Sequence, residues 1–386
     1  MLRKTALLIG VLLVATLAVL VLLQPREPAA SASGVLGGAQ AADTTGFARA
    51  SGPQPLSFPA DFGPHPDYQT EWWYYTGNLK DDQGRHFGYQ FTIFRRAVLP
   101  QDQRAPRASD WTADQIYMGH FALTDVAGQD YQAFERFARG GAGLAGAQAA
   151  PYHVWLEDWQ VEEISPGVTR LQAAAGDVAI DLTLTDLKGP VLHGDQGYSQ
   201  KGPDPGNASY YYSLPRLVSE GEVTVGDRSF PVQGLSWKDH EYSTSALAAD
   251  QVGWDWFALQ LDDGSELKAF HIRKADGSVD PYSAGSFIAP DGTVTPLTRD
   301  DFTITVHDTW RSPHTGADYP ARWTVTVPSQ DLQLEVQPFV ADQELNVSYS
   351  YWEGAVDFSG ERNGTPVRGN GYVEMTGYAG SMQGQF

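Results

Sequence analysis

Two stretches of the chain bring acidic and aromatic side chains together. Residues 234–242 read Gly-Leu-Ser-Trp-Lys-Asp-His-Glu-Tyr, and residues 253–257 read Gly-Trp-Asp-Trp-Phe. They hold four titratable groups among large rings: Asp239, His240, Glu241 and Asp255. Charged groups are costly to bury unless they are paired or put to use. These stretches are therefore the first candidates for acid–base chemistry.

The second stretch reads as a β-strand, in which side chains alternate between two faces. Asp255 then shares a face with Phe257 and Leu259, while Trp254 and Trp256 point to the opposite side. If the Phe257 face is an apolar interior, burial would raise the pKa of Asp255. A raised pKa suits a general acid that works at neutral pH.

Each group also has a purely structural interpretation. Asp239 and His240 form either an acid–base pair, in which a carboxylate orients the imidazole, or part of a satisfied polar network that fixes packing. Asp255 is either a neutral proton donor or the partner of a cation on the next strand, Arg273 or Lys268. The sequence leaves both alternatives open.

Composition narrows the class of protein. The 386 residues include 26 Lys+Arg and 47 Asp+Glu, a formal net charge of −21. This excess of acid argues against nucleic acid as a partner, because nucleic-acid binding requires a basic surface. It equally argues against docking on anionic lipid. The chain has no cysteine, which excludes disulfides, thiolate metal sites and a cysteine nucleophile.

The N-terminal segment has the pattern of an export signal. Arg3 and Lys4 precede an unbroken apolar run over residues 5–23. We expect residues 1–24 to be a signal peptide or a membrane anchor, with the rest of the chain exported to the periplasm or another extracytoplasmic space. Residues 25–57 are rich in Ala, Ser, Gly and Pro, which predicts a flexible linker.

The remainder reads as short strands. An aromatic strand over residues 69–79 and an alternating strand over residues 87–94 flank a turn, which is a hairpin signal. Strict alternation recurs later, and Asp-Gly turns recur at Asp263, Asp276 and Asp291. No long segment with helical periodicity follows Leu23. The fold is therefore predicted to be all-β.

The length of the β-rich region predicts two barrels. About 330 residues are more than one barrel needs, so we expect an N-terminal domain over residues 58–240 and a C-terminal domain over residues 241–386. The chemistry-rich stretch at residues 234–242 would then lie at their junction, which is a usual place for a ligand site.

Several motifs, in this order along the chain, resemble those of the AttH-like group of "predicted secreted hydrolases", which is related to carotenoid 1,2-hydratase. The motifs occupy residues 71–79 (EWWYYTGNL), 209–213 (SYYYS), 237–241 (WKDHE), 253–257 (GWDWF), 342–345 (DQEL), 351–356 (YWEGAV) and 371–378 (GYVEMTGY). The resemblance runs from about residue 58 to residue 378. It implies a pair of lipocalin-like (calycin) antiparallel barrels.

The resemblance also implies a reaction. The hydratase relative adds water to a terminal isoprenoid double bond without a cofactor, using an acid and aromatic rings that stabilise a carbocation. Either Asp255 or Asp239 would supply the acid here; we predict Asp255 as the proton donor, with Asp239 orienting His240 as the base for water. Residues 267–273, where a second acid is expected, offer His271 but no carboxylate. The predicted ligand-binding residues are Trp72, Tyr74, Tyr211, Trp237, Tyr242, Trp254, Trp256 and His271.

The sequence disfavours two other types of site. Metal sites need three or four convergent ligands, and the histidines fall in no H-x-H or H-E-x-x-H pattern. They are His65, His120, His193, His240 and His271 among others. A serine nucleophile at Ser236 is disfavoured, because the surrounding Gly-x-Ser-x motif ends in Lys238 where glycine is required. We predict no metal and no cofactor.

These observations predict an exported, cofactor-independent enzyme that hydrates or isomerises an apolar isoprenoid or lipid substrate by acid catalysis. The alternative is a lipocalin-like carrier that binds a small apolar ligand without chemistry. A third possibility is a scaffold whose barrels are filled by their own side chains. The expected partner is a small apolar ligand, with membrane contact only through the N-terminal segment.

Overall fold

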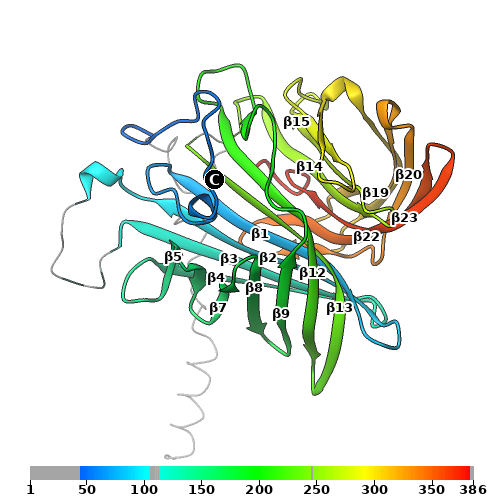
Figure 1. Cartoon of the computed structure of the whole chain (residues 1–386), viewed down its shortest axis with the longest axis horizontal. Coiled ribbons are helices and arrows are strands. Elements are labelled where there is room, and N and C mark those ends of the chain that lie inside the picture. Colours follow the sequence, from blue (N-terminus) through cyan, green and yellow to red (C-terminus); the bar gives the residue numbers. More distant parts are fainter. Residues whose placement is uncertain (1–43, 105–108, 110, 112, 245–246, 383–386) are drawn as a thin grey trace, which may run out of the picture. The chain divides into compact units, whose positions relative to one another are not determined.

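The computed structural model describes residues 44–104, 109, 111, 113–244 and 247–382. Within them, two antiparallel sheets form a nearly closed barrel and a half-barrel (Figure 1), and the only helices are four 3-10 turns of three residues each. The all-β, two-barrel prediction is confirmed. The apolar run at residues 5–23 lies outside the described residues. In the described part of the chain, no helix is long and apolar enough to cross a membrane.

The first sheet has 13 strands in the order β4-β3-β2-β1-β13-β12-β9-β8-β7-β6-β5, with β10 and β11 paired to β12. Its strands are β1 (Thr70–Lys80), β2 (His86–Ala97), β3 (Gln115–Asp125), β4 (Asp130–Arg139), β5 (Ala145–Ala149), β6 (Tyr152–Leu156), β7 (Trp159–Ser165), β8 (Val168–Ala175), β9 (Val178–Asp186), β10 (Val191–Leu192), β11 (Tyr198–Gln200), β12 (Ala208–Val225) and β13 (Arg228–Ser243). The predicted hairpin is β1 and β2.

The second sheet has ten strands in the order β17-β16-β15-β14-β23-β22-β20-β19-β18, with β21 paired to β22. Its strands are β14 (Gln251–Leu261), β15 (Glu266–Lys274), β16 (Ala284–Ile288), β17 (Val294–Thr298), β18 (Thr303–Arg311), β19 (Asp318–Val327), β20 (Leu332–Pro338), β21 (Glu344–Asn346), β22 (Ser350–Arg362) and β23 (Thr365–Met375). The 3-10 turns are η1 (Ala60–Phe62), η2 (Gln101–Gln103), η3 (Arg299–Asp301) and η4 (Pro328–Gln330).

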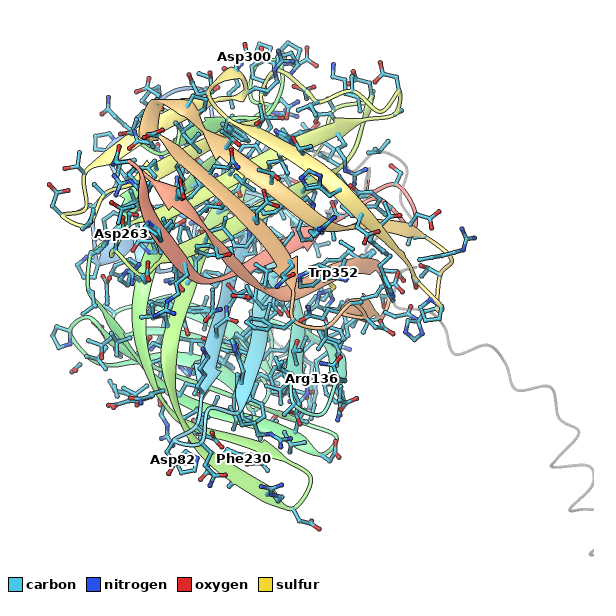
Figure 2. The ribbon with its side chains drawn as sticks, turned by 90° about the vertical axis from the view of Figure 1, so that its right-hand side faces the viewer. Asp82, Arg136, Phe230, Asp263, Asp300 and Trp352 are labelled. Atoms are coloured by element: carbon cyan, nitrogen blue, oxygen red, sulfur yellow. The ribbon has the colours of Figure 1, made fainter. Side chains whose placement is uncertain are left out.

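Each sheet encloses an apolar core of its own, and the strands between them are buried on both faces. On β1, Trp73 and Tyr75 belong to the core of the first sheet, whereas Tyr74 packs toward the second sheet. On β22, Trp352 (labelled in Figure 2) belongs to the second core, and the neighbouring Glu353 is also fully buried. A strand covered on both sides reads as a continuous aromatic run, which explains residues 71–75.

A buried ion cluster joins the two sheets. Lys188, after β9, donates to Glu266 on β15 at 2.7 Å and to two carbonyls of the second sheet's turns. Arg216 on β12 donates to the other oxygen of the same carboxylate and to the carbonyl of Leu261. Both cations therefore find their partners across the interface, which holds the sheets in register with one another.

The change from one sheet to the other falls after β13. Residue 240, where we placed the domain boundary, lies inside β13, whose pairing with β1 continues to Ser243. β14 begins at Gln251. Residues 44–57, which fall in the predicted linker, lie against the first sheet: Ala50 is fully buried, and Tyr210 donates its hydroxyl to the Gly52 carbonyl.

Candidate functional site

A cavity of about 140 Å³ lies between the two sheets, outside both barrel cores. From the first sheet and its loops it is lined by Thr70, Trp72, Tyr74, Phe94, Lys201, Ser209, Tyr211, Asp239, Glu241 and Ser243. From the second sheet and its flanks it is lined by Leu247, Trp254, Trp256, Phe270, Ile272, Tyr351, Glu353, Glu374, Thr376 and Met382. The cavity thus combines aromatic walls with four carboxyl groups, an arrangement typical of small-molecule sites.

Strand alternation decides which side chains reach the cavity. On β13, Asp239 and Glu241 face it, and the intervening His240 points to the other side of the strand. On β22 and β23, Glu353 and Glu374 are directly opposite one another in the antiparallel register. Side chains in such a pair approach closely, so these two carboxyls act on each other.

Asp239 is saturated with hydrogen bonds. Its Oδ1 accepts from the Ser213 hydroxyl and from Trp237 Nε1, the latter at 2.6 Å, and its Oδ2 accepts from the Tyr211 hydroxyl. Burial raises the pKa of Asp239, while these donors and the nearby Lys268 oppose that rise. Because hydrogen bonds to the charged form favour it, Asp239 is equipped to exist as a carboxylate.

Cations accompany the carboxylates on this side of the cavity. Lys201 Nζ lies 3.1 Å from Glu241 Oε1, and the Ser209 hydroxyl donates to the same oxygen. The amino groups of Lys201 and Lys268 lie 5.1 Å and 4.1 Å from the centre of the Tyr211 ring, and burial lowers the pKa of Lys268 well below its usual value. Both are within the range of cation–π attraction.

The carboxyls of the second sheet have a different environment. Glu353 is fully buried; its Oε2 accepts from the Tyr74 hydroxyl at 2.9 Å, but its Oε1 has no hydrogen-bond partner among the described residues. Burial and the neighbouring Glu374 raise the pKa of Glu353 well above its usual value. An unpaired buried oxygen is tolerable on a neutral carboxylic acid, which retains a proton that it can donate.

Glu374, which is only partly buried, also has a raised pKa. Burial raises its pKa to about 8, against an opposing hydrogen bond from Trp254 Nε1 at 2.8 Å. The carboxyls of Asp239 and Glu241 raise its pKa further. The cavity therefore has a neutral acid side on β22 and β23, and a hydrogen-bonded, cation-flanked side on β12 and β13. Carboxyls whose surroundings differ in this way can serve as an acid and a base in one site.

The free energy of unfolding should depend on the protonation state of Glu374. Its pKa is higher in the folded chain than in the unfolded one, so its contribution to stability is complete below about pH 4.5 and is lost as the pH rises through about 8. We expect Glu374→Gln to flatten the decline in the free energy of unfolding over this window, measured by urea unfolding at successive pH values. An unchanged pH dependence in the variant would contradict the assigned protonation.

Five of the eight predicted ligand-binding residues line the cavity: Trp72, Tyr74, Tyr211, Trp254 and Trp256. Trp237 is buried behind them and orients Asp239 through its indole N–H. Tyr242 faces the opposite side of β13, where its ring stacks on His65 at 3.5 Å. His271 stacks on Phe302 and does not line the cavity.

Of the three predicted catalytic residues, the structure brings only Asp239 to the cavity. His240 lies on the opposite face of β13, where it hydrogen-bonds Glu71 at 2.8 Å and Tyr212 at 2.7 Å. Asp239 and His240 therefore do not contact the same space, because adjacent residues of a strand point in opposite directions.

Asp255 lies on the core side of β14. Burial raises its pKa, as expected from its apolar neighbours, but its carboxylate is 3.1 Å from Arg273 Nε and accepts from the Tyr378 hydroxyl at 3.1 Å. The structure thus forms the salt bridge that was the alternative interpretation.

Glu353 and Glu374 were absent from the predicted site, although both fall in motifs that carried the family resemblance. A signal was present: Glu353 is the only charged residue in the apolar run at residues 351–356. A lone carboxyl in such a run requires a partner or a role.

One group of potential metal ligands exists among the described residues. His65, Glu71 and His240 place one ligand atom each within 4.8 Å of one another. Glu71 Oε1 already hydrogen-bonds both imidazoles at 2.8 Å, and its Oε2 accepts from Arg95 Nε at 2.8 Å. Since every atom that would bind a metal is engaged in this network, the cluster is complete as a hydrogen-bonded unit.

The chain is similar to known proteins along most of its length. Residues 49–378 match the AttH-like family. The crystal structure of an AttH protein from Nitrosomonas europaea is 36% identical, covering 84% of this chain and 97% of that one, with a TM-score of 0.74. Kievitone hydratase from Nectria haematococca shares the fold at 16% identity, covering 87% and 98% of the two chains with a TM-score of 0.66.

A third similarity is with the dehydratase asqC of Emericella nidulans. It is 27% identical over 222 residues, which is 53% of this chain and 60% of asqC. The match therefore spans less than two thirds of that relative.

Proposed function

The chain belongs to the AttH-like family, as the resemblance of its motifs predicted, and we propose that it is a hydro-lyase acting on an apolar substrate between its two sheets. The observation that carries this proposal is the pair Glu353 and Glu374, two carboxyls directly opposite each other on β22 and β23 in an aromatic cavity that also contains the hydrogen-bonded Asp239. The names of two similar proteins, a hydratase and a dehydratase, are consistent with the addition or removal of water.

The geometry supports acid-catalysed addition of water. In the first step, the π electrons of an alkene take the proton of Glu353 or Glu374, leaving a carboxylate on the protein and a cation on the adjacent carbon. The rings of Trp72 and Trp254, which line the cavity, are suited to stabilise that cation.

In the second step, a water oxygen forms the new C–O bond and loses a proton. The Tyr211 hydroxyl, which already donates to Asp239, can take this proton while passing its own to the carboxylate. One water is consumed, one alcohol is formed, and a proton has moved from the acid side to the Asp239 side. The reverse sequence removes water. None of these steps uses a cofactor, and the proposal retains export through residues 1–24.

The test is an assay with defined probes. We expect the purified protein to convert kievitone, or a short isoprenoid such as geraniol or farnesol, to a product heavier by one water, with oxygen incorporated from isotopically labelled water. Mass spectrometry detects both changes. Stoichiometric binding of these probes with no change in mass would instead indicate a lipocalin-like carrier, and the absence of both binding and turnover would reject the proposal for this substrate class.

A further inference from the structure

A second set of polar side chains leads from the first sheet to Tyr351, which lines the cavity from β22. His120 on β3 has its Nδ1 2.7 Å from the Tyr351 hydroxyl and its Nε2 3.0 Å from Glu135 Oε1. Ser348 donates its hydroxyl to the other oxygen of Glu135, which fixes the carboxylate. His120, Glu135 and Tyr351 come from β3, β4 and β22. This series of hydrogen-bonded side chains therefore forms only because the two sheets pack together.

The chain runs from the cavity toward the surface. Tyr351 lines the cavity, and His120 is fully buried. The side chain of Glu135 is 12% exposed. Tyr351, Glu353 and Glu374 line the same cavity, and Tyr351 and Glu353 lie two residues apart on the same face of β22. A carboxylate, an imidazole and a hydroxyl in series form a route along which protons can move.

The proposed reaction creates a need for such a route. After each addition of water, the acid that gave its proton is a carboxylate, fully buried in the case of Glu353, and Asp239 holds an extra proton. Neither state is ready for another turnover. We propose that Tyr351, His120 and Glu135 form a proton-transfer chain that restores the acid side from solvent. This inference rests on the proposed function.

The transfer balances one proton at a time. With His120 protonated on Nδ1, a solvent proton on Glu135 passes to Nε2, and the Nδ1 proton passes to the Tyr351 oxygen. The original Tyr351 hydroxyl proton passes to the carboxylate of Glu353 or Glu374. The result is one neutral acid, an unchanged tyrosine, and His120 protonated on Nε2. The proton that the attacking water gave to Asp239 leaves by the reverse sequence, from the cavity through Tyr351 and His120 to Glu135, so that one proton enters and one leaves per turnover and the first tautomer of His120 is restored.

The other histidine near the site does not offer this route. His193 hydrogen-bonds Ser213, which donates to Asp239, and on its far side Ser286. His193 and Ser286 are both almost fully buried, so that chain begins and ends inside the protein. Its arrangement suits the orientation of Asp239, whereas the Glu135 chain ends at a partly exposed carboxylate.

The first test distinguishes the addition of water from the reprotonation of the acid that must follow it. We expect Tyr351→Phe to bind a probe that the wild type turns over and to complete a first turnover at the wild-type rate, but to lose about tenfold or more in steady-state kcat. The control is Tyr131→Phe, because the buried Tyr131 hydroxyl lies near Glu353 and has no hydrogen-bond partner among the described residues. Equal kcat in the two variants would overturn the inference.

Chemical rescue distinguishes proton transfer from structural support. In His120→Ala, added imidazole should restore kcat in proportion to its concentration, while the same addition should leave Tyr351→Phe unchanged. If His120→Ala does not fold, Glu135→Gln is used instead. In Glu135→Gln we expect the steady-state kcat to fall and the first-turnover rate to stay at the wild-type value. A first-turnover rate that falls together with kcat in Glu135→Gln would overturn the role assigned to the chain.

A further measurement needs no substrate. Rapid dilution into D₂O should shift the infrared C=O stretch of the protonated Glu353, a band assigned by its loss in Glu353→Gln. We expect this exchange to be about tenfold slower or more in Tyr351→Phe than in Tyr131→Phe. Slowed exchange without any turnover by the wild type would support the chain and reject the hydro-lyase. Turnover by the wild type, with equal exchange rates in Tyr351→Phe and Tyr131→Phe, would support the hydro-lyase and reject the proton-transfer chain.

Discussion

Glu353→Gln is expected to lower kcat by about 10²–10⁴-fold, which is the usual contribution of a general acid, while the protein stays folded. Glutamine has the shape of a neutral carboxylic acid and can still accept from the Tyr74 hydroxyl, but it cannot give up a proton. Its amide nitrogen would occupy the position of one carboxyl oxygen without adding charge. Steady-state kinetics with a turned-over probe, together with thermal unfolding, measures both expectations.

Two other variants make this result interpretable. Glu361→Gln alters an exposed carboxylate of the same strand and should leave kcat unchanged. Asp255→Asn tests the position that the sequence favoured as proton donor, which the structure pairs with Arg273. If Asp255→Asn abolishes turnover and Glu353→Gln does not, the proton comes from the core side of β14 and our assignment of the acid is wrong.

Glu71→Ala is expected to destabilise the protein by about 3–5 kcal/mol, the typical cost of removing one partner from a buried ion pair. Glu71 and Arg95 are both fully buried, and the Glu71 carboxylate also accepts hydrogen bonds from His65 and His240. Without it, the Arg95 charge would remain in the interior opposite no carboxylate. Urea unfolding at neutral pH gives the change in the free energy of unfolding.

The pH dependence provides a second check on the same residue. The Arg95 guanidinium and the two imidazoles hold the pKa of Glu71 well below its usual value, despite burial. Its stabilising contribution is therefore complete above about pH 4.5 and is lost as the pH falls toward the folded-state pKa. The loss of stability on acidification should be smaller in Glu71→Ala. An exposed control, Glu335→Ala, should change neither quantity. A Glu71→Ala protein as stable as the wild type would show that Arg95 finds another partner.

The fold was predictable because its signals are local. Strand alternation and the turns at Asp263, Asp276 and Asp291 depend on neighbouring residues. The turns at Asp263 and Asp291 each join two strands of the second sheet, and the turn at Asp276 leads from β15 to an isolated bridge at Val279. Residues 140–150 show the limit of this approach. They contain β5, although their small side chains do not alternate with larger ones and so carry no strand pattern.

Alternation also predicted correctly that Trp254 and Trp256 share a face opposite Asp255. The same rule, applied to β13, separates Asp239 from His240, although we had predicted that they act together. The sequence by itself therefore determined which side chains share a face along each strand.

Only the tertiary structure decided which face meets the cavity and which residues meet there. Both faces of β13 and β14 are buried, one in a barrel core and the other between the sheets, so hydrophobicity does not distinguish them. Glu353 and Glu374 lie more than 100 residues after Asp239 in the sequence. Strand pairing places the two glutamates opposite each other, and the packing of the two sheets brings them to Asp239. Neither step leaves a pattern along the chain, because each depends on contacts between residues that are distant in sequence.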